Sequence, residues 1–370
     1  MRPEIVIIGA GYAGVSAAKR LDRAGLACTL IGPRDEFVER IRLHQLLAGN
    51  HPATTPLADL LPARTSHVRG TAVAIDVARR VVALRDGGEV GYDYLIYAVG
   101  SHSGLDVIAG AAEHAVTVGD LDGAVLARER LDRLPADASI TVVGGGLTGI
   151  EVAAELAEQG EHAVRLVTDG RIAETVGAKG RAYIRDVLTG LGVRVLEATP
   201  VEEIQEGKVV LADGRALDSD LSVLTATLRM PALAADSGLA TSADGALSVH
   251  PTLVSTSAPE IVGAGDAAAV AGRPVRMSCQ SACPLGMHAA ETVLHLADGT
   301  EPKPVSPKFV SQCISLGRRS GLLQHTRFDD TPTALTVTGK LGARFKERIC
   351  ASTTGIALNP RTKWFRVSWN

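Results

Sequence analysis

Gly9-Ala10-Gly11-Tyr12-Ala13-Gly14 decides the fold of the first part of the chain. A short apolar run from Glu4 to Ile8 leads into it, and residues 15–21 follow with helical periodicity. A strand, a G-x-G-x-x-G turn and a helix in this order form the fingerprint of a dinucleotide-binding unit. The glycines permit a tight turn, a close backbone approach to a pyrophosphate and close packing of helix on strand. The helix N-terminus then presents free N–H groups to the phosphates, and the expected cofactor-binding residues are Gly9, Gly11, Tyr12, Ala13 and Gly14.

Length and composition describe an ordinary globular protein. With 370 residues the chain is long enough for two or three domains. It is 46% hydrophobic and 21% charged, and its net charge of −3 gives no support for nucleic-acid binding. The first strand begins at residue 4, so we expect no cleaved signal peptide, and no apolar run reaches the roughly 18 residues of a membrane span. A cytoplasmic location is therefore the default expectation.

The cysteines indicate neither a disulfide framework nor a metal site. Their number is odd and their spacing irregular, which argues against secreted disulfides and against zinc, and we expect no metal. The five cysteines are Cys28, Cys279, Cys283, Cys313 and Cys350.

A second fingerprint lies 135 residues after the first, counted from Gly9 to Gly144 (144 − 9). The run Ile140–Val143 precedes Gly144-Gly145-Gly146-Leu147-Thr148-Gly149, and residues 150–156 continue as a helix. This separation is the length of one nucleotide domain plus a connection. Two such units indicate two dinucleotides.

Neither unit carries the acidic residue that usually binds the adenosine ribose at the end of the second strand. In the first unit Gly32 occupies this position and Pro33-Arg34-Asp35 follow. Asp35 could reach back, Arg34 could cover the adenine, or backbone groups could replace the carboxylate. We favour Arg34 together with the backbone of Gly32 and Pro33.

In the second unit Thr168 stands where the acid is expected, and Asp169-Gly170-Arg171 follow. Thr168 with Arg171 could accommodate a 2′-phosphate, whereas Asp169 argues against it. The sequence leaves NADH and NADPH both open. It also leaves open that this nucleotide site is no longer used.

Four motifs in order resemble the flavoproteins with two dinucleotide-binding domains. They are GAGYAG (9–14), YDYLIYAVGS (92–101), VVGGGLTGIE (142–151) and EIVGAGDAA (260–268). This superfamily includes type II NADH dehydrogenases, apoptosis-inducing-factor-like reductases and sulfide:quinone reductases, and the chain is most similar to the type II NADH dehydrogenase branch. The resemblance covers roughly residues 4 to 300. It implies FAD in the first unit and NAD(P)H in the second.

The implied fold is α/β, with two Rossmann-like dinucleotide-binding domains and a small C-terminal α+β region. The FAD domain is expected to be discontinuous, over residues 1–106 and 249–300. The NAD(P) domain is expected to be inserted into it, over residues 107–248. Residues 301–370 form the C-terminal region, where a dimer, acceptor or membrane contact is expected.

The resemblance also assigns roles to single residues. Asp266 matches the aspartate that binds the FAD ribitol, and Glu151 matches a glutamate near the nicotinamide and flavin, although a helix-end carboxylate could also be merely electrostatic. Arg42 and His44, in the segment Phe37 to Gly49, are either charges on a solvated helix face or side chains at the flavin edge. The expected FAD residues outside the fingerprint are Pro33, Arg34, Arg42, Ala72, Ala98, Val99, Gly100, Asp266, Cys279 and Ala282. Those for the nucleotide are Gly144, Gly146, Leu147, Thr148, Gly149, Thr168 and Arg171.

The helix that begins near Met277 gives evidence about the class of electron acceptor. Quinone-reducing relatives carry A-Q-x-A-x-Q here, and Gln280 and Ala282 match it, while Cys279 and Pro284 depart from it. These departures put ubiquinone- or menaquinone-type acceptors in doubt. Cys279 and Cys283 lie four apart and are interpreted as buried structural thiols, because a redox pair would be C-x-x-C or C-x4-C. Glu151 and Gln280 are the expected catalytic residues.

The last residues form a separate region after the proline-rich linker 301–307. Three strands (308–315, 320–328, 333–338) and a helix over about 340–352 are predicted. Basic residues alternate with aromatic ones towards the end, which is typical either of a membrane-surface helix or of a solvated face with a dimer contact. These residues are Arg344, Lys346, Arg348, Arg361, Lys363, Arg366, Phe345, Trp364, Phe365 and Trp369.

The sequence therefore predicts a FAD-dependent oxidoreductase that passes a hydride from NADH or NADPH to flavin and on to a quinone or other small-molecule acceptor. One rival is a FAD-dependent dehydrogenase or oxidase of a small organic or sulfur substrate, with a vestigial NAD(P) site. A rival of another class is a non-catalytic redox sensor. We expect no nucleic-acid partner, a location in the cytoplasm or at the cytoplasmic face of a membrane, and either a monomer or a homodimer.

Overall fold

A parallel five-stranded sheet forms the centre of the first unit. The computed structural model describes residues 2–272 and 274–359 of the chain. The strand order is β21-β9-β1-β2-β5, and every neighbouring pair is parallel. The strands are β1 (Ile5–Ile8), β2 (Cys28–Gly32), β5 (Thr65–Arg69), β9 (Tyr94–Tyr97) and β21 (Ile261–Gly263). β1 is buried at all four residues, as expected for a strand covered on both faces.

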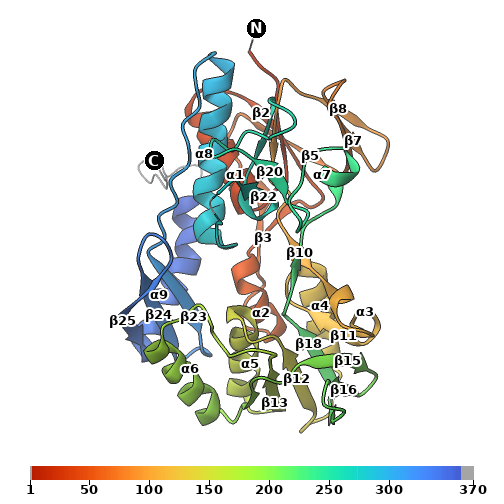
Figure 1. Cartoon of the computed structure of the whole chain (residues 1–370), viewed down its shortest axis with the longest axis vertical. Helices are drawn as coiled ribbons and strands as arrows, with labels where there is room; N and C mark the ends of the chain where they lie inside the picture. The colour runs from red at the N-terminus through yellow and green to blue at the C-terminus, as the bar shows by residue number, and fades with distance from the viewer. Residues whose placement is uncertain (1, 273, 360–370) are drawn as a thin grey trace.

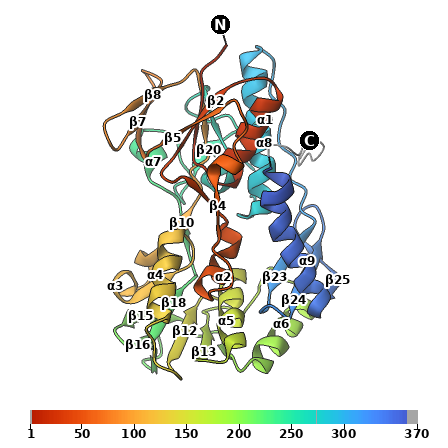
Figure 2. The ribbon, with the colours of Figure 1, turned by 180° about the vertical axis from the view of Figure 1, so that it is seen from behind.

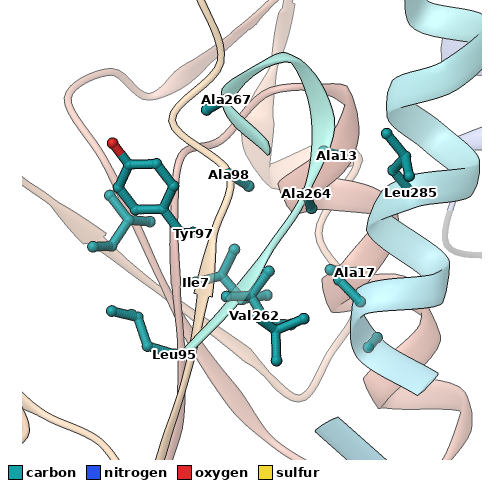
Figure 3. Packing of buried hydrophobic residues seen from close by; sticks show 14 of the residues in the cluster. Ile7, Ala13, Ala17, Leu95, Tyr97, Ala98, Val262, Ala264, Ala267 and Leu285 are labelled. Carbon is teal, nitrogen blue, oxygen red and sulfur yellow. The ribbon is translucent and has the colours of Figure 1, made fainter. Parts of the chain in front are cut away.

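Two helices from opposite ends of the first unit cover this sheet together. α1 (Tyr12–Arg23) and α8 (Cys279–Ala297) lie side by side in Figures 1 and 2. Gly286 allows their close approach, since a Cβ there would lie 2.0 Å from the carbonyl oxygen of Ala13. Figure 3 shows the core beneath them, with Ile7 of β1 and Val262 of β21 packed towards Ala17 and Leu285 of the two helices, while Leu95 and Tyr97 of β9 point to the other face of the sheet.

Smaller elements complete the first unit. An antiparallel sheet contains β6 (Ala72–Asp76), β7 (Val81–Leu84) and β8 (Glu89–Gly91), and α7 (Leu233–Asp236) packs against β6. β3 (Glu36–Val38) pairs with β4 (Thr54–Pro56), and β20 (Leu247–Val249) pairs with β22 (Ala268–Val270). Between β3 and β4 the chain forms α2 (Leu43–Leu47).

The second unit repeats the plan of the first. Its parallel sheet has the order β11-β18-β12-β13-β14. The strands are β11 (Ala115–Thr117), β12 (Ser139–Val143), β13 (Ala163–Val167), β14 (Arg194–Leu196) and β18 (Leu221–Leu224). Its helices are α3 (Ala111–His114), α4 (Leu121–Leu131), α5 (Leu147–Gln159) and α6 (Ala178–Gly190). An antiparallel sheet holds β15 (Val201–Gln205), β16 (Lys208–Leu211) and β17 (Ala216–Asp218).

The chain passes between the two units twice, through paired segments. β10 (His102–Ser103) and β19 (Leu228–Arg229) form a two-stranded antiparallel ribbon. Figure 1 shows β10 between the upper and lower parts of the molecule. The expected α/β architecture with two Rossmann-like units and a C-terminal α+β region is confirmed, while the residue limits proposed for the domains stay a prediction.

The C-terminal region is an antiparallel sheet with one helix against it. It contains β23 (Ser311–Ser315), β24 (Gly321–Thr326), β25 (Pro332–Thr338) and α9 (Gly339–Ser352), followed by a π-helical turn (Thr353–Ala357). Gly321 lets α9 approach β24 closely, because a Cβ there would lie 2.7 Å from the backbone nitrogen of Ala343. The three strands and the helix predicted from the sequence are confirmed within about four residues at each end. The tail residues from 361 onwards lie outside the described residues.

The three parts of the chain meet around α5. α2, which belongs to the first unit, packs against α4 and α5 of the second, and β23 of the C-terminal region also packs against α5. Figure 2 shows α2 above α5, with α9 and β23 beside them. Among the described residues, no helix combines the length and apolar character needed to cross a membrane.

Candidate active site

The first fingerprint forms a cradle for a pyrophosphate. Gly9 adopts φ +109°, and a Cβ there would lie 2.1 Å from the carbonyl oxygen of Ala98. Gly14 approaches Gly9 so closely that a Cβ would lie 1.9 Å from its carbonyl oxygen. A Cβ on Gly11, in contrast, would meet none of the described atoms within 4 Å, and the first turn of α1 carries no acidic residue. Open space in front of free helix N–H groups fits a bound phosphate group.

Asp266 lies beside this cradle. A Cβ on Gly265 would lie 3.0 Å from the Cβ of Ala13, which places the turn Gly265–Ala267 against the start of α1. The Asp266 carboxylate accepts a hydrogen bond from Ser101 Oγ (2.8 Å) and lies 3.5 Å from the guanidinium of Arg40. Ser101 follows the predicted residues Ala98, Val99 and Gly100 at the end of β9. The structure therefore brings these residues and Asp266 together, as a site for the ribitol and pyrophosphate of FAD requires.

The second fingerprint has the same geometry. Gly144 adopts φ +126°, Gly149 lies against the carbonyl oxygen of Gly144, and Gly146 opens to free space. Gly146 is the N-cap of α5, and Leu147 and Thr148 form its first turn. Two cradles of one design fit two dinucleotides.

Thr168 is buried against the second cradle, where a Cβ on Gly145 would lie 2.8 Å from its hydroxyl oxygen. Asp169 and Arg171 are exposed beside it. The Asp169 carboxylate accepts a hydrogen bond at Oδ1 from the backbone N–H of Gly170 (2.8 Å). Thr168 therefore packs against the second cradle, while the roles of Thr168 and Arg171 in nucleotide binding stay predictions.

Three of the predicted FAD residues, Pro33, Arg34 and Ala72, have no described contact that tests their role. The Arg34 guanidinium forms an ion pair with Asp122 (2.5 Å) at the start of α4, so it is engaged by the second unit. Pro33 is exposed next to it. Ala72 is partly buried in β6, where it pairs with Leu84. Their proposed contacts with FAD stay predictions.

Arg42 and His44 are buried, so the interpretation as charges on a solvated helix face is wrong. Each residue is only 3% exposed. Arg42 is held by Glu39 (3.2 Å), by Gln45 and by Glu347 of α9 (2.7 Å). Arg42 can carry its charge in this buried position because its acidic partners, rather than solvent, compensate it.

Glu151 is the centre of the charged cluster where the three regions meet. Its Oε1 lies 2.9 Å from Lys346 Nζ of α9 and accepts a hydrogen bond of 2.9 Å from the backbone N–H of Ser315. Its Oε2 lies 3.7 Å from His44 Nδ1. Burial acts to raise the pKa of Glu151, but Lys346, His44 and the Ser315 N–H together hold it below its usual value. Glu151 is therefore an ionised carboxylate in a buried site.

Lys346 is the cation of this pair, and the expectation that it belongs to a basic outer face is wrong. Its side chain is 11% exposed, and Glu151 raises its pKa although burial opposes the charge. Its charge also acts on Cys279, at the first position of α8, where burial raises the thiol pKa to about 11 and Lys346 works against that rise. The ion pair thus joins α5 to α9 within a buried site.

The start of α8 is well defined. Ser278 caps it in a reciprocal capping box with Ser281. Gln280 accepts a hydrogen bond from Arg276 (3.2 Å), which in turn pairs with Asp330 (2.5 Å). Ala282 is buried, and burial raises the pKa of the Cys283 thiol to about 12. Cys283 is buried, as the interpretation of a buried structural thiol requires, whereas Cys279 is only partly buried, so for Cys279 that interpretation stays a prediction.

A second carboxylate lies one turn further along α5. Glu155 is 1% exposed and binds Arg318, Ser315 Oγ (3.2 Å) and Asn50 Nδ2 (2.7 Å). The sequence did not indicate that Glu155, Arg318 and Lys346 belong to one cluster. The only local signal was the i, i+4 spacing of Glu151 and Glu155 in a helix of buried small residues.

The fold and the two cradles define a class of protein, the flavin-dependent oxidoreductases of pyridine nucleotides. Residues 3–286 match the family described as pyridine nucleotide-disulphide oxidoreductase. This match covers most of the chain, and the chain belongs to that family. It is a FAD-dependent NAD(P)H oxidoreductase, similar to NADH dehydrogenases, and the resemblance drawn from its motifs is confirmed.

Individual relatives differ in their acceptors. The chain is 32% identical to an NADH dehydrogenase-like protein of Mycobacterium tuberculosis, over 79% of this chain and 80% of the relative. It is 31% identical to the ferredoxin–NAD(+) reductase component of the biphenyl dioxygenase system of Paraburkholderia xenovorans, over 72% and 67%. The sulfide:quinone oxidoreductase of Aquifex aeolicus has the same fold, with a TM-score of 0.84 at 19% identity over 97% and 92%.

Proposed function

We propose that this protein oxidises NAD(P)H and reduces a small organic two-electron acceptor of the quinone class. FAD supplies the two-electron chemistry when it is bound, by taking a hydride from the nicotinamide. The observation that carries the proposal is the buried Glu151–Lys346 ion pair (2.9 Å), which joins the second unit to the C-terminal region. A fixed cation in a buried site stabilises negative charge that develops on a neighbouring group during reduction.

The thiols argue against a disulfide as acceptor. A disulfide reductase needs a reactive thiolate, and burial raises the pKa of both Cys279 and Cys283 far above neutral pH. The spacing of these two residues also differs from C-x-x-C and C-x4-C. Pro284, which is buried inside α8, replaces the second glutamine of the quinone-reducing pattern, so we infer a short acceptor rather than a long-chain membrane quinone.

The direct test is anaerobic titration of the holoenzyme with NADH and with NADPH, followed by addition of an acceptor. We expect one nucleotide to bleach the flavin rapidly and 1,4-benzoquinone to restore the oxidised spectrum. Oxidised glutathione is the comparison for disulfide chemistry and should leave the flavin reduced. Bleaching by neither nucleotide would contradict the proposal and would favour direct oxidation of a small substrate.

We further propose that the outer face of α9 contacts an anionic membrane surface. Leu341 and Phe345 are 54% and 42% exposed at i, i+4 spacing, and the exposed cations Lys340, Arg344 and Arg348 flank them. Exposed apolar side chains ringed by cations suit the lipid headgroup region. Co-sedimentation with phosphatidylserine vesicles should be lost in Phe345→Ser and retained in Val73→Ser. Equal binding of the two variants would contradict this contact.

A further inference from the structure

His44 lies between the two buried carboxylates of α5. Its Nδ1 is 3.7 Å from Glu151 Oε2, and its Nε2 is 3.9 Å from Glu155 Oε1. Its side chain is 2% exposed, and α2, which carries it, packs directly on α5. One imidazole therefore spans the gap between two acids that are one helical turn apart.

The two ring nitrogens of His44 differ in their hydrogen bonding. Within the described part of the chain, Nε2 is buried and has no hydrogen-bond partner. The charged groups that face the ring are Glu151 and Glu155 from α5, Lys346 from α9, Arg318 from the turn after β23, and Arg42 from its own segment. Burial lowers the pKa of His44 to about 4, with Lys346, Arg318 and Arg42 acting in the same direction and Glu151 against it. A neutral imidazole with its proton on Nδ1, towards ionised Glu151, leaves a free lone pair on Nε2.

Glu155 connects this lone pair to the surface. Its Oε2 accepts a hydrogen bond from Asn50, which is exposed. Arg318, which forms an ion pair with Glu155, is 36% exposed. Burial raises the pKa of Glu155, and Arg318 and Ser315 oppose that rise, whereas the pKa of Glu151 is lowered. The Glu155 side chain is itself 1% exposed, against 9% for Glu151, so its link to solvent runs through Asn50 and Arg318, while Glu151 contacts α9.

We propose that His44 is a proton relay that acts through Glu151, with Glu155 as the entry point from solvent. A proton taken up by Glu155 passes to His44 Nε2, while the proton on Nδ1 passes to Glu151. The bond from hydrogen to Nδ1 breaks as the bond to Nε2 forms, so one proton is transferred, no electrons move, and the ring is neutral before and after. The distances of 3.7 and 3.9 Å exceed a hydrogen bond by less than 1 Å, and such contacts commonly tighten when a site is occupied.

The inference rests on the proposed function, because it explains where a proton would be needed. Reduction of a quinone consumes two electrons and two protons, whereas NAD(P)H delivers only a hydride. The second proton has to come from solvent. The proposed path for it leads from Glu155 through His44 and ends at Glu151. Transfer of the hydride to the flavin, in contrast, needs no proton from this path.

The test is stopped-flow kinetics of the two half-reactions in His44→Gln and Glu155→Gln holoenzyme. We expect reduction by NADH or NADPH to stay within about 2-fold of wild type, while oxidation by 1,4-benzoquinone slows about 10-fold or more, with an increased solvent deuterium isotope effect. The exposed His250, changed to Gln, is the matched control and should leave both half-reactions unchanged. Unchanged oxidation rates in both relay variants would overturn the inference.

Two further measurements keep this outcome separate from other failures. If neither nucleotide reduces the flavin, the proposed function fails, but the relay is still tested on dithionite-reduced enzyme. ¹⁵N NMR of histidine-labelled wild-type protein should show His44 neutral and protonated on Nδ1 at pH 7. A doubly protonated His44 at that pH would overturn the relay without any activity measurement.

Discussion

Glu151 combines two properties that normally exclude each other, because it is buried and yet ionised. Removing one partner of a buried ion pair leaves an uncompensated charge and commonly destabilises by about 3–5 kcal/mol. We expect Glu151→Gln to retain FAD but to slow flavin reduction about tenfold or more, because the lost carboxylate no longer stabilises the positive charge that develops on the nicotinamide. The variant should also have a lower free energy of unfolding, because Lys346 is left without a counter-ion. Stopped-flow absorbance and urea unfolding measure the two effects. The exposed Glu161, changed to Gln, is the control, and a normal reduction rate in Glu151→Gln would return this residue to a purely structural role.

Asp169 is a second single residue with an expected role, in the preference for NADH or NADPH. Its Oδ1 accepts hydrogen bonds from the Gly170 N–H and from the Thr168 hydroxyl, and the residue is exposed. A carboxylate in this place accepts hydrogen bonds from ribose hydroxyls and repels a 2′-phosphate. We therefore expect NADH to be preferred, and Asp169→Ala to shift the ratio of kcat/KM for NADH over NADPH about tenfold towards NADPH. The nearby exposed Glu174, changed to Ala, should shift it less, and an unchanged ratio in Asp169→Ala would rule out this role.

Among the helices and strands, α9 contacts both nucleotide units through the ion pairs of two adjacent residues. Lys346 pairs with Glu151 of the second unit, and Glu347 pairs with Arg42 of the first. Glu347 lies 3.5 Å from Arg318 as well. One turn of α9 therefore connects the C-terminal region to both nucleotide units.

The end of the π-helical turn after α9 is fixed by a buried lysine of α1. Lys19, 1% exposed, donates hydrogen bonds to the carbonyl oxygens of Ala357 (2.8 Å) and Ile356 (3.2 Å). Burial lowers its pKa from 10.5 to about 8. Between these two pH values the unfolded chain binds a proton that the folded protein does not, so the free energy of unfolding rises with pH.

We expect this rise to amount to about 3 kcal/mol or less, and to vanish in Lys19→Met, which keeps the apolar stem without the titrating group. Urea unfolding of both proteins at several pH values from 7.5 to 10.5 gives the comparison. The exposed Lys179, changed to Met, should follow the wild type. Parallel pH profiles for wild type and Lys19→Met would show that Lys19 is not the group responsible.

At the scale of the whole molecule, the first unit is assembled from distant parts of the chain. β1 and α1 come from its beginning, whereas β21, Asp266 and α8 follow the complete second unit. A FAD bound at the first cradle would contact both parts, and a ligand held at about 100 times its Kd adds about 2.7 kcal/mol to stability.

Asp266→Ala is therefore expected to lower both FAD content and Tm, because a hydrogen-bonding carboxylate at the cradle is lost. The ratio of flavin to protein absorbance and thermal unfolding with and without added FAD measure this. Asp244→Ala, at an exposed loop position, should bind FAD normally. Full FAD occupancy in Asp266→Ala would refute the ribitol assignment.

The fold class, both dinucleotide cradles and the cofactors could be predicted from the residues alone. This is possible because a G-x-G-x-x-G turn is a local structure, in which backbone conformation and close packing depend on neighbouring residues. The sequence also predicted the strands and helix of the C-terminal region from local periodicity.

The membership of the charged cluster, in contrast, became visible only in the folded chain. Arg42 and His44 read as solvated charges, and Lys346 as part of a basic outer face, because a sequence does not show which polar side chains find buried partners. Glu151, Lys346 and His44 are brought together by three elements that meet at α5, although nearly 200 residues separate Glu151 from Lys346. The ionisation of Glu151 and the neutrality of His44 are properties of that meeting point, since burial and neighbouring charges, not residue type, set them.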